Sequence, residues 1–146
     1  MSATADHAEG QRSIVERFGL APGMVVQEIG RDDDVAEELR TSVVERIGAA
    51  LVDESYDDVV DVVLIWWRDE DGDLVDALVD ALAPLTDNGV VWLLTPKSGR
   101  PGHVPPSDIS EAATTAGLSQ TSTVSVGRDW SGARLVAPRS ARGSKR

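Results

Sequence analysis

Three consecutive aspartates, Asp32, Asp33 and Asp34, form a first acidic segment that follows Gly30 at the end of the apolar stretch 24–29. An apolar strand, a glycine turn and a helix start make the crevice in which doubly wound α/β domains hold a nucleotide-type ligand. The glycines expected after Gly30 are missing, and Arg31 and the aspartates stand in their place. The sequence therefore predicts the scaffold of a ligand-binding enzyme with an altered site.

The position of the first acidic segment leaves more than one role open. The favoured interpretation is structural, because acidic side chains at a helix start complement the positive end of the helix dipole and cap exposed N–H groups. A second interpretation is a site for a partner or a divalent cation, since carboxylate oxygens suit Mg²⁺ or Ca²⁺. No EF-hand spacing supports the cation.

A second acidic segment, Asp69, Glu70 and Asp71, follows the apolar run 61–67. The carboxyl ends of neighbouring parallel strands meet at one edge of a sheet, so we expect both acidic segments at the same edge. Together they would form a docking face for a basic protein segment, and the attraction would weaken as salt rises. The plainer interpretation is a solvated acidic loop.

Four tryptophans stand out in a chain with one Phe and one Tyr. Trp66 and Trp67 are adjacent, so they must point to opposite faces of a strand. We expect Trp66 and Trp92 in the core. Trp130 lies in a polar turn, where it is either a core residue or a partly exposed indole at a partner interface.

No side chains in the sequence form a recognisable catalytic or metal-binding group. There is no cysteine, and the two histidines are His7, in a polar leader, and His103, in a loop rich in Pro and Gly. That loop also carries Lys97 and Arg100 and could hold an anion, but it lacks the GxxxxGK[ST] spacing of a phosphate-binding loop. A linker is favoured there. We therefore assign no catalytic residue and no metal ligand.

The formal net charge of −11 disfavours nucleic-acid binding, because an acidic body repels phosphate backbones. Basic residues gather near the C-terminus, including Arg139, Arg142, Lys145 and Arg146. That tail could touch nucleic acid or an acidic partner, although a solubilising tail is favoured. No apolar run reaches the ~18 residues of a membrane span, and the N-terminus lacks the layout of a signal peptide. We predict a cytoplasmic protein and make no prediction of its oligomeric state.

Hydrophobic periodicity predicts the elements that position these side chains. A disordered leader over 1–13 and a basic disordered tail over 139–146 leave a single domain over 14–138. Expected strands cover 24–29, 61–67, 90–95, 121–126 and 133–137, and expected helices cover 33–51, 72–84 and 107–117, with a turn at Asn88-Gly89. This alternation predicts a three-layer, Rossmann-like α/β domain of about five strands. The sheet is mostly parallel and ends in an antiparallel C-terminal edge hairpin.

The chain resembles a shortened class I S-adenosylmethionine (SAM) methyltransferase over residues 21–138. GMVVQEIG resembles that family's first strand and glycine turn, TDNGVVWLLTP resembles its late strand, and AGL with two strands resembles its closing helix and hairpin. Two strand–helix units are absent between the first helix and DVVLIWW. The resemblance implies SAM binding at Gly30 and Asp32, but the missing ribose-binding strand and the Arg and Asp side chains in the crevice oppose it.

A closer likeness joins PGMVVQEIGRDDDVAEEL, WW and GVVWLLTPKSG to a small actinobacterial family of unknown function. One branch of that family is linked to oxidative-stress transcription through a sigma factor and a cysteine switch. The resemblance implies a sigma-factor partner, but no thiol sensing, because this chain lacks cysteine.

We thus predict a noncatalytic, Rossmann-like binding or regulatory protein without a cofactor. Its partner would contact the two acidic segments and Trp130. The first alternative is a degenerate SAM-binding protein or methyltransferase. The second alternative is a small-ligand sensor with a pocket between the first two strands.

Overall fold

The computed structural model describes residues 15–137, which form one five-stranded sheet with helices on both faces. The predicted leader, 1–13, and the predicted tail, 139–146, lie outside the described residues. In chain order the elements are β1 (Val26–Ile29), α2 (Glu37–Ile47), β2 (Val60–Trp66), the 3₁₀ helix η1 (Asp69–Asp71), α3 (Leu74–Leu82), β3 (Leu85–Pro96), α4 (Pro106–Thr115), β4 (Ser119–Val126) and β5 (Trp130–Val136). None of these helices is long and apolar enough to cross a membrane.

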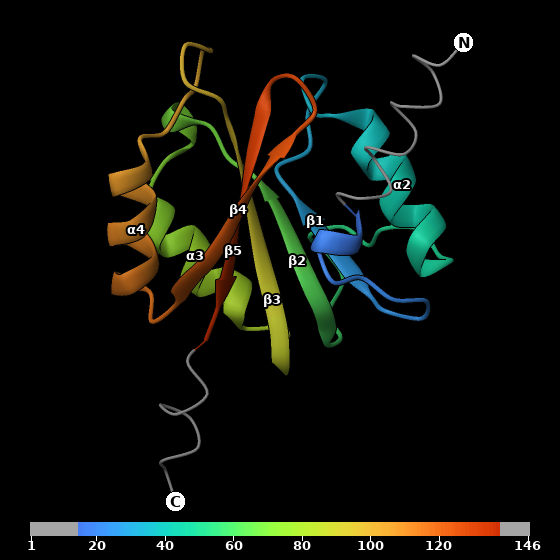
Figure 1. Cartoon of the computed structure of the whole chain (residues 1–146). Coiled ribbons are helices and arrows are strands. Elements are labelled where there is room, and N and C mark those ends of the chain that lie inside the picture. The colour runs from blue at the N-terminus through green and yellow to red at the C-terminus, as the bar shows by residue number, and fades with distance from the viewer. Residues whose placement is uncertain (1–14, 138–146) are drawn as a thin grey trace, which may run out of the picture.

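The strands lie in the order β1-β2-β3-β5-β4 (Figure 1). β2 pairs in parallel with both β1 and β3. β5 runs antiparallel to both β3 and β4, so the C-terminal hairpin forms one edge of the sheet. The predicted mostly parallel α/β sheet with an antiparallel terminal hairpin is confirmed.

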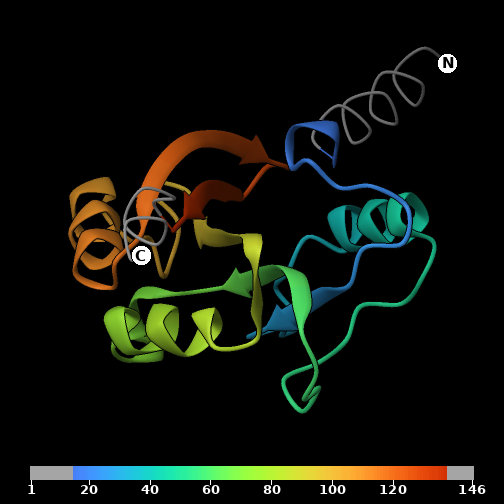
Figure 2. The same cartoon turned by 90° about the horizontal axis from the view of Figure 1, so that it is seen from below.

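The central strand β2 holds the two helical layers together, because its successive side chains point to opposite faces. Val62, Leu64 and Trp66 belong to the core cluster under α2. Val63 and Ile65 belong to the cluster under α3 and α4, on the other face (Figure 2). Full burial of each aliphatic side chain contributes about 1.5–3 kcal/mol, so this short apolar run anchors both layers.

The first helix is shorter than its apolar pattern predicts. α2 begins at Glu37 after Ala36, which makes no side-chain cap, and it ends at Gly48 in the left-handed conformation. The expectation that the aspartates cap this helix is therefore wrong, because the loop after β1 delays the helix start until Glu37. Leu51, expected on the helix, lies beyond its end.

The third strand passes through the expected turn at Asn88-Gly89. β3 starts at Leu85, and its register against β2 shifts between the pairs Val60–Leu85 and Val62–Val90, so the dipeptide lies in a bulged part of the strand. A Cβ on Gly89 would lie 2.4 Å from the Leu85 Cγ atom. Glycine is needed at this position for close packing and not for a reversal of the chain.

The segment after α2 occupies the outer side of β1. Val52 forms an isolated parallel bridge with Gln27, held by hydrogen bonds from Glu28 N to Val52 O (2.8 Å) and from Val52 N to Val26 O (3.0 Å). The chain then returns directly to β2. A single bridging residue, Val52, thus lies where the missing ribose-binding strand would pair with β1. This bridge positions the acidic residues that follow it.

Candidate functional site

The carboxyl ends of β1 and β2 approach each other closely at Gly30. This residue has φ +80°, and a Cβ on it would lie 2.4 Å from the Trp66 carbonyl oxygen. A side chain here would therefore collide with backbone that cannot move away without separating the strands. Gly30 permits the turn that the sequence predicts, but the turn lies directly against β2.

The guanidinium of Arg68 fills the space where these two strands end. Its Nη1 donates hydrogen bonds to the carbonyl oxygens of Gly30 (2.8 Å) and Trp66 (3.0 Å). Its Nε donates to Asp34 Oδ2 (3.1 Å), and its Nη2 donates to the other oxygen of the same carboxylate. Arg68 is 9% exposed, so the crevice between β1 and β2 contains a buried cation whose orientation is fixed by these hydrogen bonds.

The indole of Trp130 completes this arrangement. Trp130 Nε1 donates to the Asp34 carbonyl oxygen (3.0 Å), and the Arg68 guanidinium lies 5.3 Å from the centre of the Trp130 ring. A cation at that distance over an indole face is attracted by the ring. Backbone, carboxylate and aromatic groups therefore all hold Arg68 in place.

The Arg68–Asp34 pair shifts the protonation of both partners. The hydrogen bond from Arg68, aided by its charge, lowers the pKa of the Asp34 carboxyl although burial opposes the shift. Burial alone would lower the pKa of Arg68, but the hydrogen bonds and charges of Asp34 and Asp71 outweigh burial and raise it. The pair is thus ionised at neutral pH.

The two acidic segments meet at this same arginine. Asp71 Oδ2 accepts a hydrogen bond from the Arg68 backbone N–H (2.9 Å) and lies 3.4 Å from its Nη1. Asp34 and Asp71 are therefore brought together, as the shared sheet edge predicts, but both are ion-paired. The remaining acidic side chains of the two segments are exposed: Asp32, Asp33, Asp69 and Glu70.

Three of the four tryptophans are core residues, and Trp67 is partly buried. Trp66 and Trp92 are fully buried, as predicted, and Trp66 packs edge-on against Trp130 with ring centres 4.9 Å apart. Trp130 is 4% exposed. Of the two alternatives left open for Trp130, the structure shows the core residue, because the polar turn places it at the start of β5, where its ring is covered by Trp66 and Arg68.

A buried carboxylate lies below the crevice. Glu28 is 7% exposed and accepts hydrogen bonds from Trp66 Nε1 (2.8 Å), Arg40 Nε (2.6 Å) and Arg40 Nη2 (3.0 Å). Since all of its partners lie on α2 and β2, Glu28 ties β1 to both elements. Arg40 Nη1 also donates to Glu37 Oε1 (2.9 Å), so each of these donors has a partner in the protein, which favours a structural role.

Glu54 is the acidic residue that the sequence analysis missed. It follows the Val52 bridge by two positions, and its Oε2 accepts the Gly30 N–H (3.0 Å). Dinucleotide-binding domains place an acid about 20 residues after the glycine turn, where it binds the ribose hydroxyls. Glu54 lies 24 positions after Gly30 and so occupies a comparable place in this chain. The signal in the sequence is the acidic pair directly after Leu51-Val52.

The described residues do not fit SAM in this arrangement. Arg68 fills the crevice, Glu54 occupies the Gly30 N–H, and the turn has no further glycine that would let a ligand approach the backbone. Asp34, an acid at this crevice, is paired with Arg68. A SAM-sized ligand would first have to displace the Arg68 side chain.

The basic loop after β3 also has defined geometry. In the loop after β3, Lys97 Nζ donates to the Gly127 carbonyl oxygen (3.1 Å) and Arg100 pairs with Asp129 (2.7 Å), so its cations bind the β4–β5 turn. Over residues 15–137, no three His, Cys, Asp or Glu side chains are grouped in a way that could hold a metal ion.

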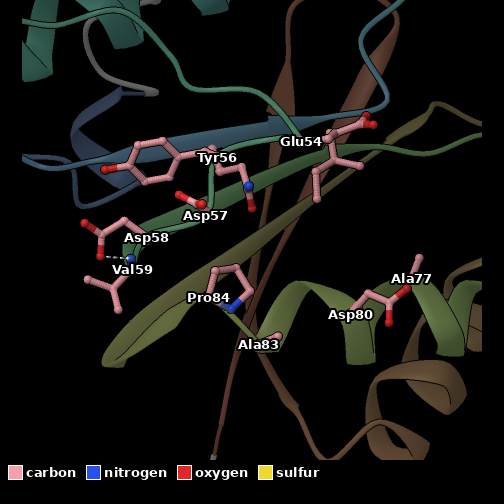
Figure 3. A pocket seen from close by; sticks show the side chains of 11 residues that line it. Glu54, Tyr56, Asp57, Asp58, Val59, Ala77, Asp80, Ala83 and Pro84 are labelled. Atoms are coloured by element: carbon pink, nitrogen blue, oxygen red, sulfur yellow. Dashed lines mark hydrogen bonds between the residues drawn. The ribbon is translucent and has the colours of Figure 1, made fainter.

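A cavity of about 690 Å³ opens between the loop that precedes β2 and helix α3 (Figure 3). Gln27 and Ile29 of β1 also line it. The cavity therefore lies on the α3 side of the first strands, and Glu54, which accepts the Gly30 N–H, lines it. The sensor interpretation had placed a pocket between the first and second strands themselves.

Comparison with known sequences places the chain among proteins without an assigned activity. The family described as "Protein of unknown function (DUF3052)" matches residues 15–139. Uncharacterised proteins of Mycobacterium bovis and of two Mycobacterium tuberculosis strains are 49% identical over 141 residues, which cover 97% of this chain and 87% of each relative.

Solved structures with a similar fold are methyltransferases. A SAM-dependent methyltransferase from Aquifex aeolicus has a TM-score of 0.58 at 16% identity, covering 86% of this chain and 88% of that one. The magnesium protoporphyrin IX methyltransferase of Synechocystis, solved with bound SAM, has a TM-score of 0.55 at 13% identity, covering 90% and 80%. Mitomycin 7-O-methyltransferase has a TM-score of 0.57 at 14% identity; the match covers 88% of this chain and only 53% of that enzyme. At these identities the similarity shows the fold alone.

Proposed function

The chain belongs to the DUF3052 family of proteins of unknown function, and from this premise we propose that it is a noncatalytic binding protein with a shortened methyltransferase fold. The observation that carries the proposal is the Arg68 guanidinium, which occupies the end of the β1–β2 crevice. Because the Arg68 side chain has this many fixed hydrogen-bond partners, its role is to stabilise the fold. The protein would therefore not use the crevice for SAM.

The proposed binding surface is the exposed part of the carboxyl edge. Asp32, Asp33, Asp69 and Glu70 are solvent-exposed there, around the buried Arg68. Carboxylates on a protein of net charge −11 attract basic segments at long range. The partner would be a protein with a basic docking segment, in the cytoplasm. A sigma factor, and with it a role in stress-linked transcription, remains the prediction that the family resemblance implies.

Two binding measurements test this proposal. Calorimetric titration with SAM should give no saturable heat, and saturable binding by the wild-type chain would overturn the closed crevice. Capture of partners from lysate should fall as salt rises, because exposed charges are screened within a Debye length of about 8 Å at physiological salt. Identical capture at low and high salt would exclude the acidic edge.

A matched pair of charge variants localises the surface. One variant changes Asp32, Asp33, Asp69 and Glu70 to Asn or Gln, and its control changes Glu16, Glu45, Asp108 and Glu111, which are also exposed. Both lose the same charge, so a general electrostatic effect would reduce capture equally in the two variants. Selective loss in the first variant supports the carboxyl edge.

A second candidate function, binding of a nucleoside-type ligand such as SAM, is supported by the position of Glu54. Its carboxylate lies beside Gly30, where an acid would hold ribose hydroxyls. For this candidate, titration with S-adenosylhomocysteine should be saturable in the wild type and at least about tenfold weaker in Glu54→Gln. Absence of binding by the wild type removes this candidate and leaves the first.

A further inference from the structure

The cavity beside α3 has an apolar floor and an acidic rim. Ile29, Ala77 and Pro84 provide apolar lining. The acidic residues that line it are Glu54, Asp57, Asp58 and Asp80 (Figure 3). Its lining contains no lysine or arginine from the described part of the chain. An occupant would therefore carry positive charge together with some apolar surface.

Two features of the cavity suit a docking surface. Val59 lines it and is 59% exposed, which makes it one of two large hydrophobic residues exposed among residues 15–137. Gln27 also lines it and is only 4% exposed. Its Nε2 donates to the Asp53 carbonyl oxygen (3.1 Å), but no described group donates to its amide oxygen. Buried polar atoms are normally paired, so this oxygen can accept a hydrogen bond from a donor that enters the cavity.

The described part of the chain ends at Ala137, close to the cavity. β5 is antiparallel to β3, so its carboxyl end lies at the edge of the sheet where β2 and β3 begin (Figure 1). Ala137 packs against the same core cluster as α3 and α4. The cavity lining includes Val59 and Pro84, which directly precede β2 and β3. The C-terminal segment thus starts at the end of the sheet where β2 and β3 begin, on the α3 face that carries the cavity.

Length and charge both suit the C-terminal segment, residues 138–146. At 3.3–3.6 Å per residue it spans about 30 Å when extended. The start of β2 lies two strand spacings from β5, about 10 Å. The segment contains four basic side chains, Arg139, Arg142, Lys145 and Arg146, and no acidic one.

We propose that residues 138–146 dock across this cavity and place their basic side chains on its acidic rim. A backbone N–H or a guanidinium of the segment supplies the donor for the Gln27 amide oxygen, and the segment covers Val59. A second copy of the domain is a poorer occupant, because two-fold association through this face would bring identical acidic rims together. The proposal is independent of the partner surface at the carboxyl edge.

Disulfide trapping in the full-length chain tests the docking directly, since the native sequence has no cysteine. The test variant carries Val59→Cys with Ala141→Cys, and the matched control carries Glu45→Cys with Ala141→Cys. Val59 and Glu45 are both exposed, but Glu45 lies on α2, on the opposite face of the sheet. In a glutathione redox buffer, the intrachain disulfide should form at least about tenfold faster in the test variant, as followed by mass spectrometry.

Two additional variants separate docking from random collision. Asp57→Asn with Asp58→Asn, or conversion of the four basic tail residues to Gln, should each slow trapping in the test variant at least fivefold and leave the control unchanged. Equal rates in the test and control variants overturn the proposal. A disulfide-linked dimer in place of the intrachain product also overturns it, and assigns the cavity to a second copy.

Discussion

The Asp34 carboxylate and the Arg68 guanidinium form a two-point ion pair that joins the loop after β1 to the end of β2. Two-point pairing fixes the orientation of both groups as well as their distance. Because Arg68 also binds the carbonyl oxygens of Gly30 and Trp66, the pair occupies the end of the β1–β2 crevice, the place where doubly wound α/β domains bind ligands.

Replacing Arg68 should destabilise the fold. In Arg68→Ala, the Gly30 and Trp66 carbonyl oxygens lose a donor, so we expect the free energy of unfolding to fall by about 2–3 kcal/mol. Arg68→Lys should recover less than half of the loss, because an ammonium cannot reproduce the guanidinium fork. Urea denaturation followed by tryptophan fluorescence measures both values. Arg31→Ala is the control, since the Arg31–Glu37 pair is exposed, and wild-type-like stability in Arg68→Ala would contradict the structural role.

The Asp34 carboxyl should make stability depend on pH in the acid range. Its pKa is lowered in the folded state by the Arg68 hydrogen bond, so the unfolded chain binds a proton more readily than the folded one. The stabilisation is therefore complete above the unfolded pKa of about 3.9 and is lost as the pH falls through the lower folded pKa. The stability difference between wild type and Asp34→Asn should be constant from pH 7 to about pH 5 and shrink below pH 4. If the stability difference between wild type and Asp34→Asn grows on acidification, the pKa of Asp34 is not lowered in the folded state.

Gly30 and Gly48 provide a test of the close strand approach. Both have positive φ, +80° and +79°, but only at Gly30 would a Cβ meet backbone. Gly48→Ala should cost about 1 kcal/mol, the price of a left-handed alanine. Gly30→Ala adds a collision with the Trp66 carbonyl oxygen, so its loss in unfolding free energy should be at least twice as large. Equal losses would mean that the β1 and β2 ends can separate freely.

Patterns of apolar residues predicted the layers of the fold well. The continuous run around Val62 and Trp66 indicates a strand covered on both faces, and the structure buries it so. The boundaries of α2 were less predictable, because Val35 and Leu51 continue the helical spacing although loops hold them. Apolar spacing reports which face is buried and cannot tell a helix from a loop that packs on the same core.

The candidate site was harder to predict, because its key contacts join residues distant in sequence. Asp34 and Arg68 are separated by 34 positions and Gly30 and Glu54 by 24. The acidic segment was conspicuous, but nothing local indicates that Asp34 is ion-paired while Asp32 and Asp33 are exposed. A single arginine after a buried strand carries no motif, and its role depends on the tertiary approach of two strands.

The Glu28–Arg40 pair should couple more strongly than an exposed ion pair. Glu28 is buried and receives two hydrogen bonds from Arg40, so the double-mutant cycle of Glu28→Gln and Arg40→Gln should give a coupling energy of about 1–3 kcal/mol. Trp66→Phe removes the third donor to Glu28. That variant should therefore lower stability on its own while leaving most of the Glu28–Arg40 coupling intact.

Salt distinguishes this buried pair from a surface interaction. The control cycle uses Arg100→Gln and Asp129→Asn, whose side chains are 49% and 52% exposed. Screening reaches exposed charges and largely spares buried ones, so 1 M NaCl should abolish any coupling in the control and leave the Glu28–Arg40 coupling nearly unchanged. Urea denaturation at the two salt concentrations gives both cycles. If the Glu28–Arg40 coupling also disappears in salt, the carboxylate is reached by solvent, and β1 is not tied to α2 by a buried ion pair.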